Sequence, residues 1–140
     1  MSLTFHPEPG TILVCDFSGL REPEMVKRRP VVVISPRLKR RDGLLTVAPL
    51  STTEPKHIMD YHSRIDLNPT LPEPYDAPVM WVKGDMIYNV CFDRLELLRT
   101  KRDHTGKRKY LQCQLDEPTI REIKKAVLFG LGFSELTKHL

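Results

Sequence analysis

The stretch that most constrains this chain runs from Lys27 to Pro36 and reads Lys-Arg-Arg-Pro-Val-Val-Val-Ile-Ser-Pro. Four consecutive β-branched residues are typical of a strand whose two faces are both buried. Pro30 lacks a backbone N–H, so it fits the first position of such a strand and not its middle. The sequence therefore predicts a core strand with three cations, Lys27, Arg28 and Arg29, at its N-terminal end, where they can bind a phosphate.

The composition is that of one soluble globular domain spanning residues 1–140, with 40% hydrophobic and 29% charged residues. Apolar runs fall short of the roughly 20 residues that cross a bilayer, and the N-terminus lacks the pattern of a signal peptide. We therefore expect a cytoplasmic protein. Cysteine occurs three times, at Cys15, Cys91 and Cys113, without the spacing of a zinc site or a disulfide framework. We expect reduced core thiols, no metal and no cofactor.

The positive charge is unevenly distributed along the chain. The formal net charge is only +4, but the cations concentrate in three short stretches, 27–29, 37–41 and 99–109. Clustering of this kind favours a polyanionic partner. Solvated polar loops would explain the same clusters, so charge alone does not decide between the two.

Short apolar runs predict several strands followed by one helix. The predicted strands are 11–17, 29–35, 44–50, 79–82 and 86–92, with a further one somewhere in 58–65. Residues 95–99 and 110–115 form a predicted hairpin around the basic tip 101–109, and alternation in its second arm indicates a half-buried strand. Asp116 caps a helix whose predicted inner face holds Ile120, Ile123, Val127 and Leu131. The fold class expected is mainly β (α+β), a small barrel closed by a C-terminal helix.

Three of these segments, 10–17, 29–36 and 47–52, resemble the PemK/MazF family of toxins from type II toxin–antitoxin systems. A looser likeness extends through residues 82–85 and the C-terminal helix. The resemblance implies a small SH3-like β-barrel that forms a homodimer. It also implies a growth-inhibiting, metal-independent endoribonuclease that cuts single-stranded RNA at short sequences and is bound by an antitoxin protein.

The resemblance also implies which residues act. Arg29 stands at the family's catalytic arginine, and Ser51 stands where a catalytic threonine is usual. Thr52 and Thr53 follow Ser51 directly, so this alignment can slip by one position, and both are candidates for RNA binding. A guanidinium presents paired donors to phosphate oxygens, and a hydroxyl adds one more donor for the transition state of RNA cleavage.

Two carboxylates match acidic positions of the family, Glu24 in the loop before Arg29 and Asp85 after the fourth long strand. Either is a candidate general base for the 2′-hydroxyl, and Arg29 itself is a third candidate for moving the proton. Lys27, Arg28 and Lys83 are candidates for RNA binding. The five histidines are expected on the surface, with one alternative left open: His57 and His62 lie in a stretch without a clear assignment and could approach the site.

Each candidate has a structural alternative. Arg29 can be an ion-pair partner of Glu24 or Asp16, Ser51 can cap a turn, and Asp85 can be an ordinary turn residue. At the level of function, the alternative is a non-catalytic barrel that binds nucleic acid or a protein partner. It is motivated by a 23–28 loop that differs from the family pattern and by the added basic tip.

Overall fold

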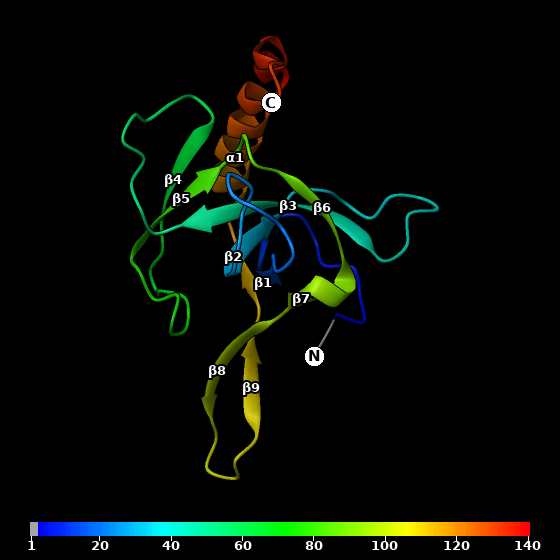
Figure 1. Ribbon diagram of the computed structural model, residues 1–140, viewed down its shortest axis with the longest axis vertical. Coiled ribbons are helices and arrows are strands. Elements are labelled where there is room, and N and C mark those ends of the chain that lie inside the picture. Colours follow the sequence, from blue (N-terminus) through cyan, green and yellow to red (C-terminus); the bar gives the residue numbers. More distant parts are fainter. Residues whose placement is uncertain (1–2) are drawn as a thin grey trace.

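The computed structural model describes residues 3–140, apart from the side chain of Lys101. A curled antiparallel sheet forms the body, one helix covers part of it, and a two-stranded hairpin extends away from it (Figure 1). This architecture confirms the predicted β-barrel with a C-terminal helix. The strands are β1 Thr11–Asp16, β2 Arg28–Val33, β3 Leu44–Ser51, β4 His62–Asp66, β5 Val79–Lys83, β6 Tyr88–Cys91, β7 Leu95–Glu96, β8 Leu98–Arg102, β9 Arg108–Leu111 and β10 Cys113–Gln114. The helices are α1 Glu117–Gly130 and two 3₁₀ segments, η1 Phe92–Arg94 and η2 Ser134–His139.

Strand β3 is the one around which the sheet curls. The strand order is β10-β1-β2-β3-β5-β4, with β6 paired to β3 and β7 paired to β1. One edge of β3 pairs with β2, and the other pairs first with β6 and then, at Leu50 and Ser51, with β5. The end of β3 therefore joins β2 to the β5–β4 hairpin.

Side-chain alternation divides the sheet into two faces, each with its own core. On the helix face, strand residues pack with Ile123 and Val127 of α1. On the loop face, strand residues pack with Phe17 and Met25 of the loop between β1 and β2. The helix face includes Ile12, Val14, Val32, Ala48, Leu50 and Val82. The loop face includes Leu13, Cys15, Val31, Val33, Leu45 and Val47.

The predicted strand at 29–35 is present, but it begins earlier than expected, at Arg28, with Pro30 in its third position. Strand β2 pairs with β1 from Arg28 onward, whereas its pairing with β3 starts only at Val31. The first residues of β2 are thus unpaired on the side that faces β3. The missing N–H of Pro30 therefore breaks no hydrogen bond of the sheet there. As strand neighbours, Arg28 and Arg29 lie on opposite faces of the sheet.

Helix α1 begins as the sequence predicts. The Asp116 carboxylate accepts a 2.9 Å hydrogen bond from the Thr119 N–H, and Pro118 lies in the first turn. Ile123 and Val127 are buried, in agreement with the predicted inner face. The prediction for Leu131 is wrong, because that side chain follows the end of the helix and is 48% exposed.

Two glycines let α1 dock closely against the turn between β5 and β6. A Cβ on Gly84 would lie 2.5 Å from the Ala126 carbonyl carbon, and a Cβ on Gly130 would lie 2.6 Å from the Gly84 oxygen. Both distances are too short for any side chain. The helix and the turn that follows Lys83 are therefore in direct backbone contact.

The predicted hairpin forms from β8 and β9, with Leu98 opposite Leu111 and Arg102 opposite Arg108. The expected half-burial of the second arm, residues 110–115, is wrong for Leu111, which is exposed like the rest of β9. It is confirmed for Cys113 and Leu115, which are partly buried against the core of the helix face. Figure 1 shows that the arms and tip of this hairpin extend away from the barrel. Its base is different, because Leu98 of β8 is buried in the core of the helix face.

The three thiols are free, but they are not equally buried. Burial raises the pKa of Cys15 to about 12. Cys113 is half-buried, and burial raises its pKa as well. Cys91 is exposed, contrary to the expected core position.

Within residues 3–140, the helices are all too short or too polar to cross a membrane.

Candidate active site

A cleft of about 500 Å³ opens where the β1–β2 loop meets the end of β5. It brings together three predicted site residues from separate parts of the chain, Glu24, Arg29 and Lys83. Its full lining is Glu22, Pro23, Glu24, Met25, Val26, Arg29, Lys83 and Met86.

The β1–β2 loop is fixed at its middle and near its ends. Met25 is 5% exposed within the loop-face core, and its N–H donates a 2.9 Å hydrogen bond to the Tyr88 hydroxyl. The Phe17 N–H donates to the Lys27 carbonyl at 3.0 Å and closes the base of the loop. Glu24 is exposed next to the anchored Met25, and one of its carboxylate oxygens accepts from the Arg21 N–H at 3.2 Å. The loop therefore presents a carboxylate to the cleft from a held backbone.

Arg29 is half-buried, and the backbone holds its side chain in place. Its Nε donates a 3.1 Å hydrogen bond to the Val26 carbonyl. Within the described part of the chain, Arg29 forms no ion pair; Asp16, one of its suggested partners, pairs with Arg28 at 3.7 Å. The two terminal nitrogens of Arg29 can thus donate hydrogen bonds to a ligand in the cleft. A guanidinium oriented in this way is well suited to bind a phosphate.

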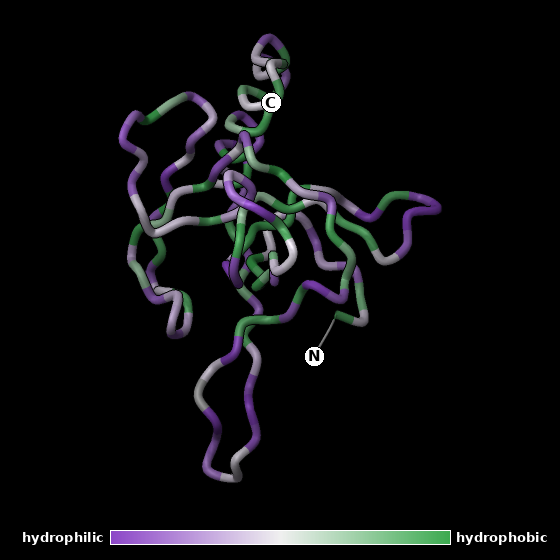
Figure 2. Tube along the Cα trace, viewed as in Figure 1, coloured by the Kyte–Doolittle hydropathy of each residue, from purple (hydrophilic) through white to green (hydrophobic). Residues whose placement is uncertain are grey.

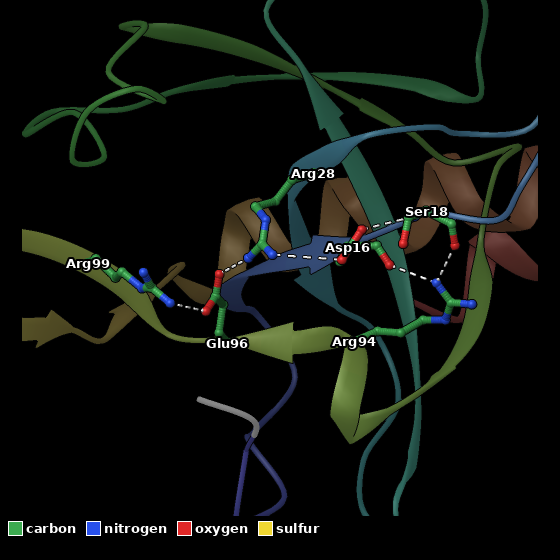
Figure 3. Close-up of polar contacts among 6 residues, drawn as sticks. All are labelled: Asp16, Ser18, Arg28, Arg94, Glu96 and Arg99. Carbon is green, nitrogen blue, oxygen red and sulfur yellow. Dashed lines mark hydrogen bonds and ion pairs between the residues drawn. The ribbon is translucent and has the colours of Figure 1, made fainter.

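Arg28, the preceding residue, is on the other face of β2 and is engaged by carboxylates (Figure 3). It pairs with Glu96 of β7 and with Asp16 at the end of β1. Glu96 also pairs with Arg99 of β8 at 2.7 Å. The predicted role of Arg28 in RNA binding would therefore require it to leave or share two carboxylates.

Figure 3 shows that the same region is tied further by Arg94, which donates to the Asp16 and Ser18 carbonyls at 2.9 Å each. The Ser18 N–H donates to the Asp16 carboxylate at 2.9 Å. Hydrogen bonding from Ser18 to this carboxylate, with smaller help from the charges of Arg28 and Arg94, holds the pKa of Asp16 below its usual value.

Ser51 shares the loop face with Arg29, although it does not line the cleft. The β2–β3 register pairs Val31 with Pro49, and continuing it would place Arg29 opposite Ser51. Ser51 is itself opposite Trp81 of β5. Ser51 is 5% exposed, and its hydroxyl oxygen accepts from the Thr53 N–H at 3.2 Å. It does cap a turn, as one alternative expected, while its O–H remains a donor.

The remaining predicted residues do not line the cleft. Thr52 and Thr53 are exposed after the end of β3, and Lys27 is exposed in the turn before β2. Asp85 lies in the turn closed by the Met86 N–H and the Lys83 carbonyl at 3.1 Å, outside the residues that line the cleft.

The sequence did not predict the residues that position the site. Val26, Met25 and Tyr88 fix Arg29 and the loop, and nothing in their local pattern marks such contacts. His62, expected on the surface, is half-buried on β4 opposite Lys83, and its Nδ1 accepts from the Met59 N–H at 3.0 Å.

Across residues 3–140, no three His, Cys, Asp or Glu side chains gather closely enough to hold a metal ion.

Comparison with known proteins agrees with this fold. Residues 8–129 match the family described as PemK-like, MazF-like toxin of type II toxin–antitoxin system. An uncharacterized protein of Haemophilus influenzae is 34% identical, covering 97% of this chain and 98% of its own length. The uncharacterized protein YifN of Escherichia coli K12 is 26% identical, covering 94% and 96%. A mycobacterial endoribonuclease solved in complex with its cognate antitoxin has the same fold, with a TM-score of 0.59, 19% identity and coverage of 91% and 96%. The chain therefore belongs to the PemK/MazF family of toxins of type II toxin–antitoxin systems.

Proposed function

We propose that this protein is a metal-independent endoribonuclease toxin that cuts single-stranded RNA at short sequences. The observation that carries the proposal is Arg29, which lies in a cleft with Glu24 and Lys83 and forms no ion pair among the described residues. An arginine that a backbone carbonyl orients, and that no carboxylate neutralises, is prepared to bind a phosphate.

In the proposed reaction, the ribose 2′-oxygen attacks the adjacent phosphorus and the bond to the 5′-oxygen breaks. Glu24 is our candidate base for the 2′-hydroxyl proton, because it lines the cleft and Asp85 does not. Arg29 stabilises the charge on the non-bridging oxygens, where one such donor is worth about 10²–10³ in rate. The 5′-oxygen takes up a proton as it leaves, so the products carry a 2′,3′-cyclic phosphate and a 5′-hydroxyl.

Lys83 adds a positive charge to the same cleft from the end of β5. Ser51, on the same face as Arg29, is our candidate for a further donor to the phosphate. Thr52 and Thr53, which follow the end of β3, are candidates for binding the RNA. Because Ser51 is 5% exposed, this role requires the turn at Thr53 to move and expose the Ser51 hydroxyl when RNA binds.

The partners proposed are a second copy of the chain and an antitoxin protein. Family membership supports both, and the mycobacterial neighbour was solved with its cognate antitoxin. Light scattering on the purified protein tests the dimer, and co-expression with the gene next to its own tests the antitoxin.

The central experiment is incubation of the purified protein with a long RNA, with and without EDTA, followed by sequencing and chemical analysis of the cut ends. We expect cutting at a short sequence, cyclic phosphate ends and no loss with EDTA. The Arg29→Ala variant should be folded and should not cut.

Full cutting by Arg29→Ala would remove Arg29 from the site, and loss of cutting in EDTA would replace the proposed chemistry with a metal-dependent one. One observation favours a second function, a barrel that binds RNA without cutting it: the Ser51 hydroxyl oxygen is buried and already accepts a hydrogen bond. RNA bound tightly and left intact, even at high protein excess, would be the result expected from that function.

A further inference from the structure

The β8–β9 hairpin, residues 98–111, holds the entire positive excess of the protein. It contains six of the 22 Lys and Arg residues but only one of the 18 Asp and Glu residues, so it carries a net +5. The rest of the chain, with 16 cations and 17 carboxylates, has a net charge of −1. The hairpin extends away from the barrel, and its arms and tip are mostly hydrophilic (Figures 1 and 2). Its described cations, Arg99, Arg102, Lys107, Arg108 and Lys109, are all exposed. A field concentrated in this way attracts a polyanion to one place.

One face of the hairpin carries three arginines and a tyrosine. Arg99 is directly opposite Tyr110, and Arg102 is directly opposite Arg108. Cross-strand partners share a face, and Arg108 and Tyr110 are two residues apart on β9. The two pairs therefore lie on the same side, although the register shifts between Arg99 and Arg102. Tyr110 is 40% exposed and leaves its ring accessible beside the guanidinium groups. Cations interleaved with an aromatic ring are the pattern that binds single-stranded nucleic acid, through phosphates and base stacking.

The hairpin is electrostatically unsatisfied as it stands. Like charges directly opposite on two strands destabilise the pairing, which is the situation of Arg102 and Arg108. Lys107, Arg108 and Lys109 form no ion pairs with any side chain that the structure describes. The single carboxylate, Asp103, is used to close the tip, accepting from the Thr105 and Lys107 N–H groups. A bound chain of phosphates would relieve this repulsion.

The base of the hairpin is joined to the strand that carries Arg29. Glu96 pairs with Arg99 of β8 and with Arg28 of β2, the neighbour of Arg29 (Figure 3). Beside this joint is a groove of about 850 Å³, to which Arg28, Arg99 and Arg108 contribute. Three carboxylates, Glu73, Asp76 and Glu96, balance them there. The described hairpin cations that do not line this groove, Arg102, Lys107 and Lys109, lie further out toward the tip and carry the unbalanced charge.

We propose that the β8–β9 hairpin is an accessory arm that binds single-stranded RNA at nucleotides outside the cleft. Phosphates lie along its Lys and Arg side chains, and a base stacks on Tyr110. The inference rests on the proposed function in one respect, the choice of RNA as the polyanion. The arm acts on affinity for long RNA and takes no part in the chemical step.

The test is a binding titration that requires no cutting. In an Arg29→Ala background, the affinity for a labelled unstructured RNA of about 30 nucleotides is measured against salt concentration. The arm variant is Lys107→Gln, Arg108→Gln and Lys109→Gln together. The matched control removes three positive charges from helix α1 with Arg121→Gln, Lys124→Gln and Lys125→Gln.

We expect the arm variant to lower the salt slope by about 2 and the affinity by about 100-fold near 0.1 M salt, because each lost phosphate contact contributes about 0.7 to the slope. The control should change affinity by much less. Tyr110→Ala should weaken binding by about tenfold through lost stacking, and Tyr110→Phe should retain it. Because Arg108→Gln removes the Arg102–Arg108 repulsion, unfolding of the hairpin would not be the cause of the loss.

Equal slopes for the arm variant and the α1 control would overturn the proposal. So would a glutamate-rich peptide that binds the hairpin as tightly as RNA and ignores Tyr110→Ala, since that result assigns the arm to an acidic protein. The two proposals also fail separately. Intact RNA bound with an arm-dependent slope refutes cutting alone, while normal cutting with an unchanged KM for long RNA in the arm variant refutes the arm alone.

Discussion

Arg28 and Arg29 are neighbours in the sequence, yet they belong to different regions of the molecule. Arg29 faces the cleft, is oriented by the Val26 carbonyl and forms no ion pair among the described residues. Arg28 faces the opposite side of the sheet and is held by Glu96 and Asp16. The role of these two arginines is therefore set by the presence or absence of a fixed counter-charge, because their residue type is the same.

The largest expected effect tests this contrast directly. Arg29→Gln should lower the rate of RNA cutting by about 10²–10³-fold, because it removes a charged donor to the transition state. Arg28→Gln, the same change one residue away, should leave the rate within about tenfold of wild type, since that guanidinium is engaged by carboxylates. Single-turnover cutting of one RNA by both variants measures the difference. Equal losses would mean that both arginines serve the cleft.

A second change should disturb the cleft that contains Arg29 and leave the groove beside Arg28 unchanged. Gly130→Ala should cost about 1–3 kcal/mol of stability, because its Cβ would overlap the Gly84 oxygen and the Asp85 Cα. It would also move the turn that follows Lys83, so cutting should fall along with the thermal midpoint. Lys124→Ala, an exposed site on the same helix, is the control. An unchanged midpoint for Gly130→Ala would show that the helix and turn are not in close contact.

A third change should act mainly on the groove side. Glu96→Gln removes the charge that joins Arg28 to Arg99 and should cost about 1.5–3 kcal/mol, the usual range for hydrogen bonds to charged groups. Cutting of a short RNA that fits the cleft should persist. Chemical denaturation and a short-substrate assay separate the two readouts. A large loss of short-substrate cutting with normal stability would show that the two faces are coupled.

The smallest effect is a pH dependence at Asp16. The folded-state pKa of Asp16 is lowered from 3.8, chiefly by the Ser18 N–H. A lowered pKa contributes stability above the unfolded-state value, and this contribution is lost as pH falls through the folded-state value. Asp16→Asn should therefore reduce the fall of stability below about pH 4 and change the slope little at neutral pH. Parallel acid titrations of both proteins with the same slope would contradict this.

Much of the fold could be predicted because its signals are local. The β-branched run at 31–34 predicts β2, and the Asp116 cap with Pro118 predicts the start of α1. Contacts between distant segments could not be predicted in this way. Arg28 and Glu96 are 68 residues apart, and their pairing depends on how β7 and β2 each lie against β1.

The candidate site shows the same division between local and distant information. The family pattern located Arg29, Glu24 and Lys83, which the structure brings into one cleft. The burial of Ser51 and the position of Asp85 outside that cleft follow from the register of β3 and from the docking of α1. The exposed state of β9 was missed because alternation in sequence does not reveal whether any layer lies opposite a strand.

The backbone at Lys27 also protects the chain against a shift of register. If Arg29 were deleted, Arg28 would become the residue before Pro30, and Lys27 would take the position of Arg28 near Glu96. Charge alone would therefore suggest that this deletion is harmless. Lys27, however, has a φ of +71°, and after such a deletion Val26 would have to adopt that conformation. A β-branched residue is a genuine outlier there. Deletions in this segment are therefore opposed by backbone geometry, even where the charges would be conserved.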